Sequence, residues 1–211
     1  MHVCSSALDT PRHFWNRNIH YHDLVLAAVP PDCRRALDVG CGDGLLATEL
    51  AGRCGEVVGI DVDTVTLARA RARYRRPNLT FVEADVMNHA FEPASFDFIT
   101  AVATLHHLPL EPALKRFDQL LGPGGVLSVV GLYRLRTLVD FSYACAAVPV
   151  SWWWRLTKNY EEVAAPIRDP DQSLAEVRHV TTEVLPGASI TRQLLFRYSL
   201  LWRKPSRNPH A

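Results

Sequence analysis

The feature that most constrains the fold is a glycine-rich turn that follows a short apolar run. Residues 35–39 read Arg-Ala-Leu-Asp-Val and lead into Gly-Cys-Gly-Asp-Gly at residues 40–44, after which residues 45–50 favour a helix. A buried strand, a tight turn and a helix form the first unit of a nucleotide-binding α/β sheet. Glycine permits a positive φ and a close approach of ligand to backbone, and the open amides of the helix start face that ligand. The alternative is a tight turn that binds nothing.

The spacing of the three glycines argues against a phosphate ligand. The dinucleotide fingerprint is G-x-G-x-x-G, and here Gly44 comes one residue too early. The phosphate loop is absent too, because no Lys-Ser or Lys-Thr follows the glycines. Asp38 and Asp43 would repel a diphosphate but suit a cation. S-adenosylmethionine (SAM) carries a nucleoside, a sulfonium and an ammonium and no phosphate, so the turn predicts binding of SAM rather than NAD.

Composition favours one domain without a polyanionic partner. The chain has 211 residues, 48% of them hydrophobic, and a formal net charge of +1. This length and apolar content suit a single domain. The balanced charge leads us to expect no nucleic-acid partner and no membrane-surface partner.

Three further features lead us to expect a cytoplasmic protein. The N-terminus lacks the apolar stretch of a signal peptide. The most apolar segment, residues 138–154, contains Asp140 and Pro149 and is shorter than a membrane span, so we expect no stable membrane insertion. The cysteines are odd in number and lack metal-binding spacing, which favours reduced thiols and no metal site. They are Cys4, Cys33, Cys41, Cys54 and Cys145.

Strand and helix patterns alternate after the turn, which predicts a parallel, doubly wound α/β sheet. Ligands of such sheets bind at the carboxyl ends of the strands. The strands are expected at 35–39, 56–61, 79–85, 96–103 and 126–131, with helices at 64–74 and 112–121 and a turn at 122–125.

Acidic residues end two of these strands. Asp61 lies 21 residues after Gly40, and an acidic residue near that offset accepts the two ribose hydroxyls of a nucleoside. Asp61 or Asp63 could instead only cap the following helix; we assign the cap to Asp63 and ribose binding to Asp61. Asp85 could accept a hydrogen bond from an adenine amino group or simply form a turn.

These motifs together resemble a class I SAM-dependent methyltransferase, most closely the small ubiquinone/menaquinone-biosynthesis-like group. The resemblance rests on residues 36–44, 60–61, 83–85, 96–97, 105–108 and 121–125. It implies that Gly40, Cys41 and Gly42 lie against the methionine part of SAM, and that S-adenosylhomocysteine is the product. It also implies a Rossmann-like seven-stranded sheet, mostly parallel with an antiparallel last strand, whose final hairpin is formed by residues 189–196 and 198–203. The predicted cofactor-binding residues are Asp38, Gly40, Cys41, Gly42, Gly44, Asp61, Val62, Asp85, Val86 and Ala101.

The expected organisation is one methyltransferase domain. Residues 1–34 form a helical lid, 35–132 the SAM-binding core, 133–187 a cap over the acceptor and 188–204 the C-terminal hairpin. The lid contains the group His20-Tyr21-His22, which either lies on the surface or closes the acceptor side. The cap contains Trp152-Trp153-Trp154, which cannot all face one side of a helix, and which either pack below the cap or meet an apolar or aromatic acceptor.

Methyl transfer needs a general base only if the nucleophile keeps its proton. His106 or His107 could serve, or these residues could only cap the strand end. The expectation for the acceptor pocket is that residues 14–22 and the segment from Tyr133 to Tyr160 close it. The catalytic candidates are therefore Tyr21, His22, His106, His107 and Tyr133.

The predicted function is transfer of the SAM methyl group to an oxygen, nitrogen or carbon atom of a small, apolar or aromatic metabolite, by a monomer or homodimer. One alternative is an RNA or protein methyltransferase. The arginines between residues 69 and 76 could form a nucleic-acid patch or a solvated helix face, but the Asn/Asp-Pro-Pro-aromatic motif of nucleic-acid amino methylation is absent after the fourth strand. Another alternative is a regulatory protein that binds SAM without transferring its methyl group.

Overall fold

The computed structural model describes residues 15–137, 140, 143, 153, 170–194 and 196–206. Several residues named above therefore lie outside the described part, among them Cys4, Phe14, Cys145, Trp152, Trp154 and Tyr160. Trp153 is described and is 65% exposed.

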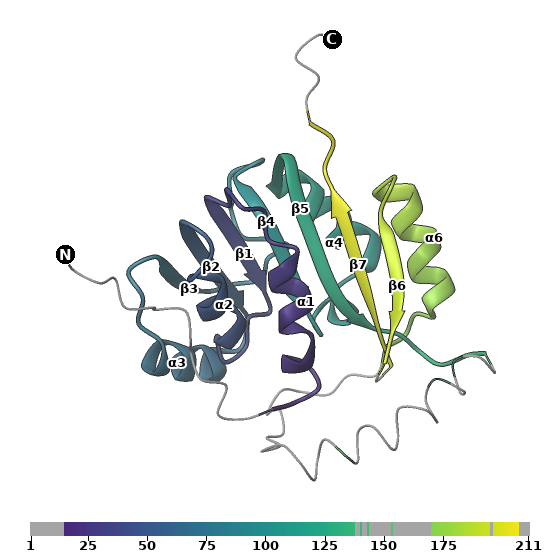
Figure 1. Cartoon of the computed structure of the whole chain (residues 1–211), viewed down its shortest axis with the longest axis horizontal. Helices are drawn as coiled ribbons and strands as arrows, with labels where there is room; N and C mark the ends of the chain where they lie inside the picture. Colours follow the sequence, from purple (N-terminus) through teal and green to yellow (C-terminus); the bar gives the residue numbers. More distant parts are fainter. Residues whose placement is uncertain are drawn as a thin grey trace.

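A single seven-stranded sheet forms the centre of the molecule (Figure 1). The strands lie in the order β3-β2-β1-β4-β5-β7-β6, and β7 runs antiparallel to both β5 and β6 while the other pairs are parallel. This confirms the predicted Rossmann-like sheet with its antiparallel last strand. The strands are β1 (Arg35–Val39), β2 (Glu56–Asp61), β3 (Leu79–Glu83), β4 (Phe96–Val102), β5 (Leu121–Leu132), β6 (Ser189–Gln193) and β7 (Arg197–Arg203).

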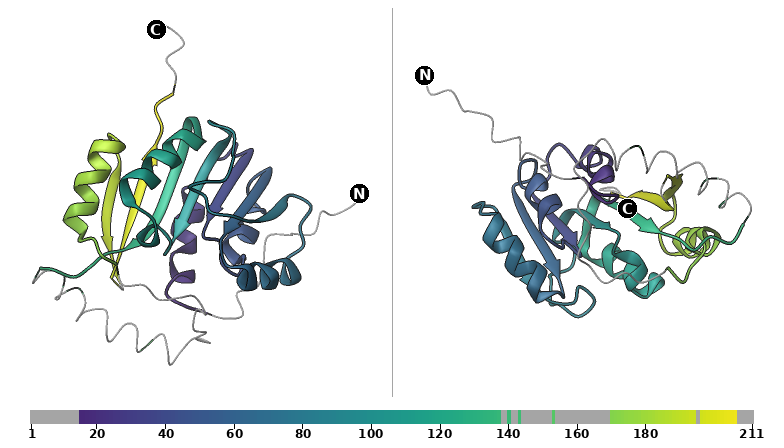
Figure 2. Two further views of the ribbon diagram at one scale, coloured as in Figure 1. Left: turned by 180° about the vertical axis from the view of Figure 1, so that it is seen from behind. Right: turned by 90° about the horizontal axis from the view of Figure 1, so that it is seen from below.

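Helices cover both faces of the sheet (Figures 1 and 2). Alternate strand residues supply the two cores: Ala36 of β1 packs with the cluster that contains α1 and α2 side chains, whereas Leu37 packs with the cluster that contains α4 and α6 side chains. This alternation is the two-residue period of a strand buried on both sides. The helical elements are η1 (Ile19–Tyr21), α1 (His22–Ala27), α2 (Leu45–Leu50), α3 (Thr64–Arg73), η2 (Leu105–His107), α4 (Leu110–Leu120) and α6 (Leu174–Val184).

The described part of the N-terminal leader is helical only over η1 and α1, which is shorter than predicted. The Asn16 side chain explains the start, because its Oδ1 accepts the N–H groups of Asn18 and Ile19 at 2.9 Å each. The α1 helix begins near the carboxyl edge of the sheet and then crosses one face (Figure 1). The leader is thus placed where it can contact a ligand at that edge.

The predicted turn at residues 122–125 is instead part of β5. The β4–β5 register shifts between Phe96 and Phe98, which absorbs the extra residues as an irregularity in the strand. Backbone bonds to the end of β7 hold this segment, since Gly124 donates to Lys204 O at 3.0 Å and Lys204 donates to Gly125 O at 2.8 Å. Pairing with a distant strand therefore overrides the local turn signal.

The two described ends of the predicted cap lie side by side. Arg134 donates its N–H to Gln172 O at 2.8 Å and bridges to Ser173. Asp140, buried, accepts the N–H groups of Arg136 and Thr137 and pairs with Arg192 of β6 at 2.8 Å.

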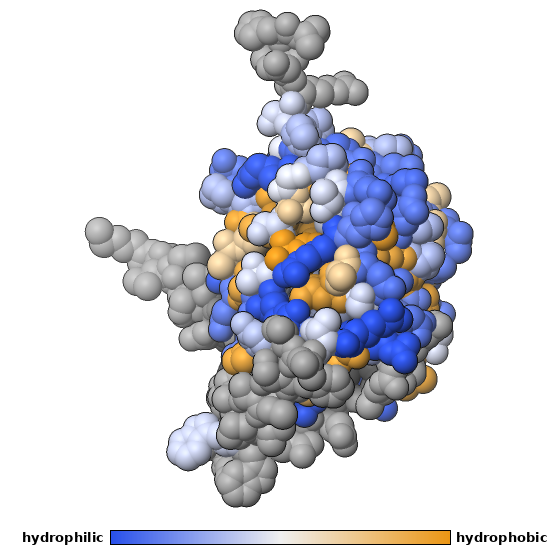
Figure 3. Space-filling view, turned by 90° about the vertical axis from the view of Figure 1, so that its right-hand side faces the viewer, coloured by the Kyte–Doolittle hydropathy of each residue, from blue (hydrophilic) through white to orange (hydrophobic). Residues whose placement is uncertain are grey.

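Figure 3 views the side of the molecule that carries β6 and α6, where apolar side chains gather in the middle and hydrophilic ones surround them. In the described part of the chain, no helix is long and apolar enough to cross a membrane.

Candidate active site

A cavity of about 600 Å³ lies at the carboxyl edge of the sheet. It brings together the ends of β1, β2 and β4, the residues after β3, the glycine turn, the start of α2 and the N-terminal segment. From α3 it is lined by Thr66, Arg69 and Arg73. Ten of the predicted site residues line it, namely His22, Asp38, Gly40, Cys41, Gly42, Asp61, Val62, Asp85, Val86 and His107.

Hydrogen bonds from the glycine turn attach it to the end of β2. The N–H groups of Gly40 and Cys41 both donate to Ile60 O, at 2.8 and 3.1 Å. Gly42 donates its N–H to Asp61 Oδ2 at 2.8 Å. The backbone of the turn is therefore fixed by the same strand that supplies the acidic residue.

Two of the glycines cannot carry a side chain here. Gly40 has φ +67°, and a Cβ on it would collide with the side chain of Thr104, which follows β4. Gly44 has φ +81°, and its Cβ would lie 2.6 Å from the Phe81 ring. Gly44 does not line the cavity; it lets α2 start close to β3 and so supports the turn from behind.

The Asp61 carboxylate is held in one orientation and remains partly exposed in the cavity. Its Oδ2 accepts the Gly42 N–H and its Oδ1 accepts the Asp63 N–H at 3.0 Å. Each carboxylate oxygen has a second lone pair, so two acceptor sites remain for neighbouring hydroxyl donors. Asp63 caps α3, accepting the N–H groups of Val65 and Thr66.

Asp38 is a buried acid in the cavity lining. It is 2% exposed, and its Oδ2 has no hydrogen-bond partner among the described residues. Burial, followed by the nearby carboxylates of Asp61 and Asp43, raises the pKa of Asp38 from 3.8 to about 8. A buried carboxyl oxygen without a partner is costly, and a cationic ligand group beside it would favour the ionised form of Asp38.

The Cys41 thiol also lines the cavity, but burial raises its pKa, and this disfavours the reactive thiolate. Cys41 Sγ would lie 3.0 Å from a Cβ on Gly59, so the thiol fills the space beside that residue. Cys33, Cys41 and Cys54 are all buried free thiols.

Asp85 makes the hydrogen bonds of a turn residue and also lies in the lining of the cavity. Its oxygens accept from Met87 N–H and Asn88 Nδ2, both at 2.9 Å, which is the bonding of a turn residue. It also lines the cavity together with Val86. Ala101, by contrast, is fully buried in the α4 core and does not line the cavity.

The five catalytic candidates separate in the structure. His22 and His107 line the cavity; His106 does not, although its ring centre lies 4.0 Å from that of His107. Tyr21 is buried away from the lining, donates its hydroxyl to Leu194 O and has a pKa raised to about 12, mainly by burial. Tyr133 is buried below the Arg192 guanidinium, and burial raises its pKa too.

Sequence reasoning did not single out several lining residues. Asn16, Asn18 and Thr104 contribute polar atoms, and Ile19 and Leu108 contribute apolar surface. An Asn three residues before a helical segment is a capping signal, which could have identified Asn16. Thr104 lines the cavity because β4 ends beside the glycine turn, and no local pattern reports that contact.

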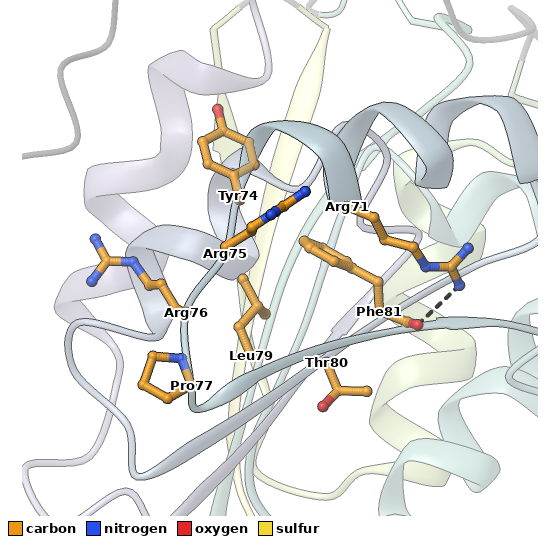
Figure 4. A pocket seen from close by; sticks show the side chains of 8 residues that line it. All are labelled: Arg71, Tyr74, Arg75, Arg76, Pro77, Leu79, Thr80 and Phe81. Carbon is orange, nitrogen blue, oxygen red and sulfur yellow. Dashed lines mark hydrogen bonds between the residues drawn. The ribbon is translucent and has the colours of Figure 1, made fainter.

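A second cavity, of about 480 Å³, lies against α3 and β3 and differs in chemistry (Figure 4). Its lining includes Arg71, Arg75 and Arg76 and no acidic residue. Arg71 donates to Phe81 O at 3.0 Å. This cavity suits an anion, whereas the lining of the first cavity combines five acidic residues with Arg69 and Arg73. In the described part of the chain, no three His, Cys, Asp or Glu residues form a group that could hold a metal ion.

Two glycines with matched backbone angles test the packing of the turn. Gly44 and Gly187 have φ +81° and +83°, but nothing lies within 4 Å of a Cβ on Gly187. We expect Gly187→Ala to cost about 1–2 kcal/mol from the backbone conformation alone. Gly44→Ala adds a steric cost of about 1–3 kcal/mol. Urea denaturation measures both, and equal losses would contradict the close packing of the turn on Phe81.

A pH series tests the buried state of Asp38. The pKa of Asp38 in the folded protein is about 8, above its ordinary value of 3.8. The contribution of Asp38 to the free energy of unfolding is therefore complete below pH 4 and is lost as the pH rises toward 8. Asp38→Asn does not titrate there. The free energy of unfolding of the variant, relative to the wild type, should therefore increase between pH 5 and 8 by up to about 1.4 kcal/mol per pH unit. A difference that stays constant over this range would show that Asp38 titrates normally.

Comparisons with known proteins show the family of the chain. A family model described as a methyltransferase domain matches residues 37–129. An uncharacterised methyltransferase of Mycobacterium tuberculosis is 39% identical over 202 residues, covering 90% of this chain and 98% of that protein. A ubiquinone biosynthesis O-methyltransferase of Paracidovorax citrulli is 39% identical over 148 residues, covering 65% of this chain and 60% of its own length.

Solved structures agree on the fold. A putative SAM-dependent methyltransferase from Listeria monocytogenes superposes with a TM-score of 0.64 at 14% identity, covering 88% of this chain and 98% of that one. The YcgJ protein from Bacillus subtilis gives a TM-score of 0.62 at 19% identity, covering 82% and 71%. With the extended similarity to the mycobacterial relative, these findings show that the chain belongs to the class I SAM-dependent methyltransferases.

Proposed function

We propose that this enzyme transfers the methyl group of SAM to a small, apolar or aromatic metabolite held in the cavity at the carboxyl edge. The observation that carries the proposal is the cavity of about 600 Å³ in which the buried Asp38 carboxyl, whose Oδ2 has no hydrogen-bond partner among the described residues, sits beside an oriented Asp61 carboxylate. Cavities of this size are typical of small-molecule sites. A cationic nucleoside fits both carboxyl groups.

The chain's residues fit SAM in a consistent arrangement. The backbone of Gly40 and Gly42 leaves room for the methionine part, and Asp38 supplies negative charge beside it. Asp61 offers its two remaining acceptor sites to the ribose hydroxyls. Asp85 and Val86 lie at the next strand end, where the adenine would rest. When bound, SAM supplies an activated methyl group, so the chain must mainly align an acceptor and exclude water.

The acceptor side of the cavity supports a compact substrate. Ile19 and Leu108 give it apolar walls, and His22 and His107 provide polar groups. The relative from Paracidovorax citrulli is named an O-methyltransferase of ubiquinone biosynthesis. This similarity, which covers part of both chains, supports an aromatic acceptor that is methylated on oxygen.

A polyanionic acceptor such as RNA is the second candidate, and the arginine-lined cavity on α3 and β3 favours it. The cavity that holds Asp38 and Asp61 is also lined by two arginines, Arg69 and Arg73, but its lining contains five acidic residues. We therefore favour the small acceptor.

Replacing Asp61 tests the cofactor assignment. Asp61→Ala removes both ribose acceptors, and hydrogen bonds to a charged group contribute about 1.5–3 kcal/mol each. The dissociation constant for SAM, measured by calorimetry, should rise at least tenfold. Glu83→Ala is the matched control, because Glu83 is an exposed acid at the neighbouring strand end and does not line the cavity. An unchanged dissociation constant in a folded Asp61→Ala variant would exclude the assignment.

A further inference from the structure

We propose that His22 and Glu49 act as a unit, with His22 as the general base and Glu49 as its positioning residue, and that the acceptor atom is a hydroxyl oxygen. This inference rests on the proposed function and narrows its acceptor to an alcohol or phenol. It also assigns the base to the lid rather than to the histidines after β4.

The two side chains meet across the interface between α1 and α2. His22 is the first residue of α1 and Glu49 lies in the last turn of α2. His22 Nδ1 lies 2.7 Å from Glu49 Oε2, and the two side chains are only 6% and 10% exposed. A short, buried imidazole–carboxylate contact of this kind is strong and fixes the orientation of the ring.

This contact determines which ring nitrogen can take a proton. An ionised carboxylate only accepts hydrogen bonds, so Nδ1 carries the hydrogen and Nε2 keeps its lone pair in the neutral ring. The His22 ring makes no second hydrogen bond to the described residues, and His22 lines the cavity that also contains the glycine turn. Nε2 is therefore the basic atom that His22 can offer to a ligand.

Other charged groups lie near the His22–Glu49 contact, on the elements packed around α1 and α2. Glu49 lies close enough to Asp38 on β1 to raise the pKa of that acid. Arg53, after α2, donates to Leu26 O near the end of α1, and Arg197 of β7 donates to Asn18 before η1. Both arginines thus hold the leader through polar bonds, while Glu49 is the carboxylate bonded to the ring.

His107 and His106 are placed differently. His107 also lines the cavity but is exposed, and His106 lies outside the lining. A base that is buried and held by a carboxylate transfers protons in a fixed geometry, whereas the exposed His107 ring packs against the ring of His106. The structure therefore favours His22 for the proton-transfer role.

The proton transfer is needed when the acceptor is a hydroxyl group but not when it is a neutral amine. As the hydroxyl oxygen forms its bond to the methyl carbon, the methyl–sulfur bond breaks and its electron pair stays on sulfur. The O–H bond breaks at the same time, and Nε2 takes the proton, giving an imidazolium stabilised by Glu49. A neutral amine attacks through a free lone pair and needs no such base before the step.

Nuclear magnetic resonance tests the tautomer without any acceptor. The ¹⁵N shifts of the His22 ring are recorded in the full-length wild type, with Glu49→Gln as the comparison. We expect a neutral ring with its hydrogen on Nδ1 in the wild type and a mixture of tautomers in Glu49→Gln. A wild-type ring with its hydrogen on Nε2 would overturn the proposal.

Kinetics test the role in transfer, with simple catechols, phenols and aromatic amines as probes and S-adenosylhomocysteine formation as readout. His22→Gln should lower kcat for hydroxyl probes at least 100-fold, with the SAM dissociation constant changed less than twofold. Glu49→Gln should lower kcat about tenfold and move the acidic limb of the pH–rate profile to lower pH, and Glu49→Asp should partly restore both. Glu111→Gln, an exposed acid on α4, is the control and should change neither.

The outcomes separate this inference from the proposed function. Loss of SAM affinity in His22→Gln without loss of kcat would show that His22 binds the cofactor and would overturn its role as the general base. Turnover of amine probes alone would overturn the hydroxyl acceptor and leave methyl transfer to a small molecule intact. Failure of SAM to bind the wild type would overturn both. If no probe is turned over, the tautomer measurement decides.

Discussion

The site depends on the bonds that join the glycine turn to the end of β2. Ile60 O accepts two turn amides and Asp61 Oδ2 accepts a third, so backbone and carboxylate of one strand end fix the turn. The same bonds orient Asp61 toward the cavity. Thr104 and Phe81 then pack where side chains on Gly40 and Gly44 would otherwise lie. Small changes in this contact would displace the turn, the Asp61 carboxylate and the start of α2 together.

The charge of the glycine turn accounts for the expected preference for SAM over a diphosphate better than the shape of the turn does. Burial raises the pKa of Asp38 most, and the neighbouring carboxyl groups of Asp61 and Asp43 raise it further. A diphosphate would add to this repulsion. A cation relieves this repulsion. The hydroxyl groups of a positively charged nucleoside would also donate to the oriented Asp61 carboxylate. The protein thus keeps an unfavourable charge arrangement that its ligand makes favourable.

The sequence predicted the parts of the molecule that local patterns determine. Alternating buried strands and helices predicted the sheet, and acidic residues at strand ends predicted that Asp38, Asp61 and Asp85 share one edge. Contacts between distant segments were not predictable in this way. Tyr21 bonds Leu194, 173 residues away, and so is buried rather than facing the cavity. The bonds between β5 and the end of β7 override the glycine turn at residues 122–125, and the His22–Glu49 contact arises only when α1 packs on α2.

Proton exchange on SAM binding tests the central claim, that a buried acid beside the glycine turn receives a cation. With a pKa of about 8, Asp38 is mostly protonated at pH 7 in the free protein, and a bound cation should ionise it. Calorimetry at pH 7 in buffers of different ionisation enthalpy gives the number of protons released. The account predicts a net release on SAM binding that is lost or greatly reduced in Asp38→Asn. Equal proton exchange in the wild type and the variant would contradict it.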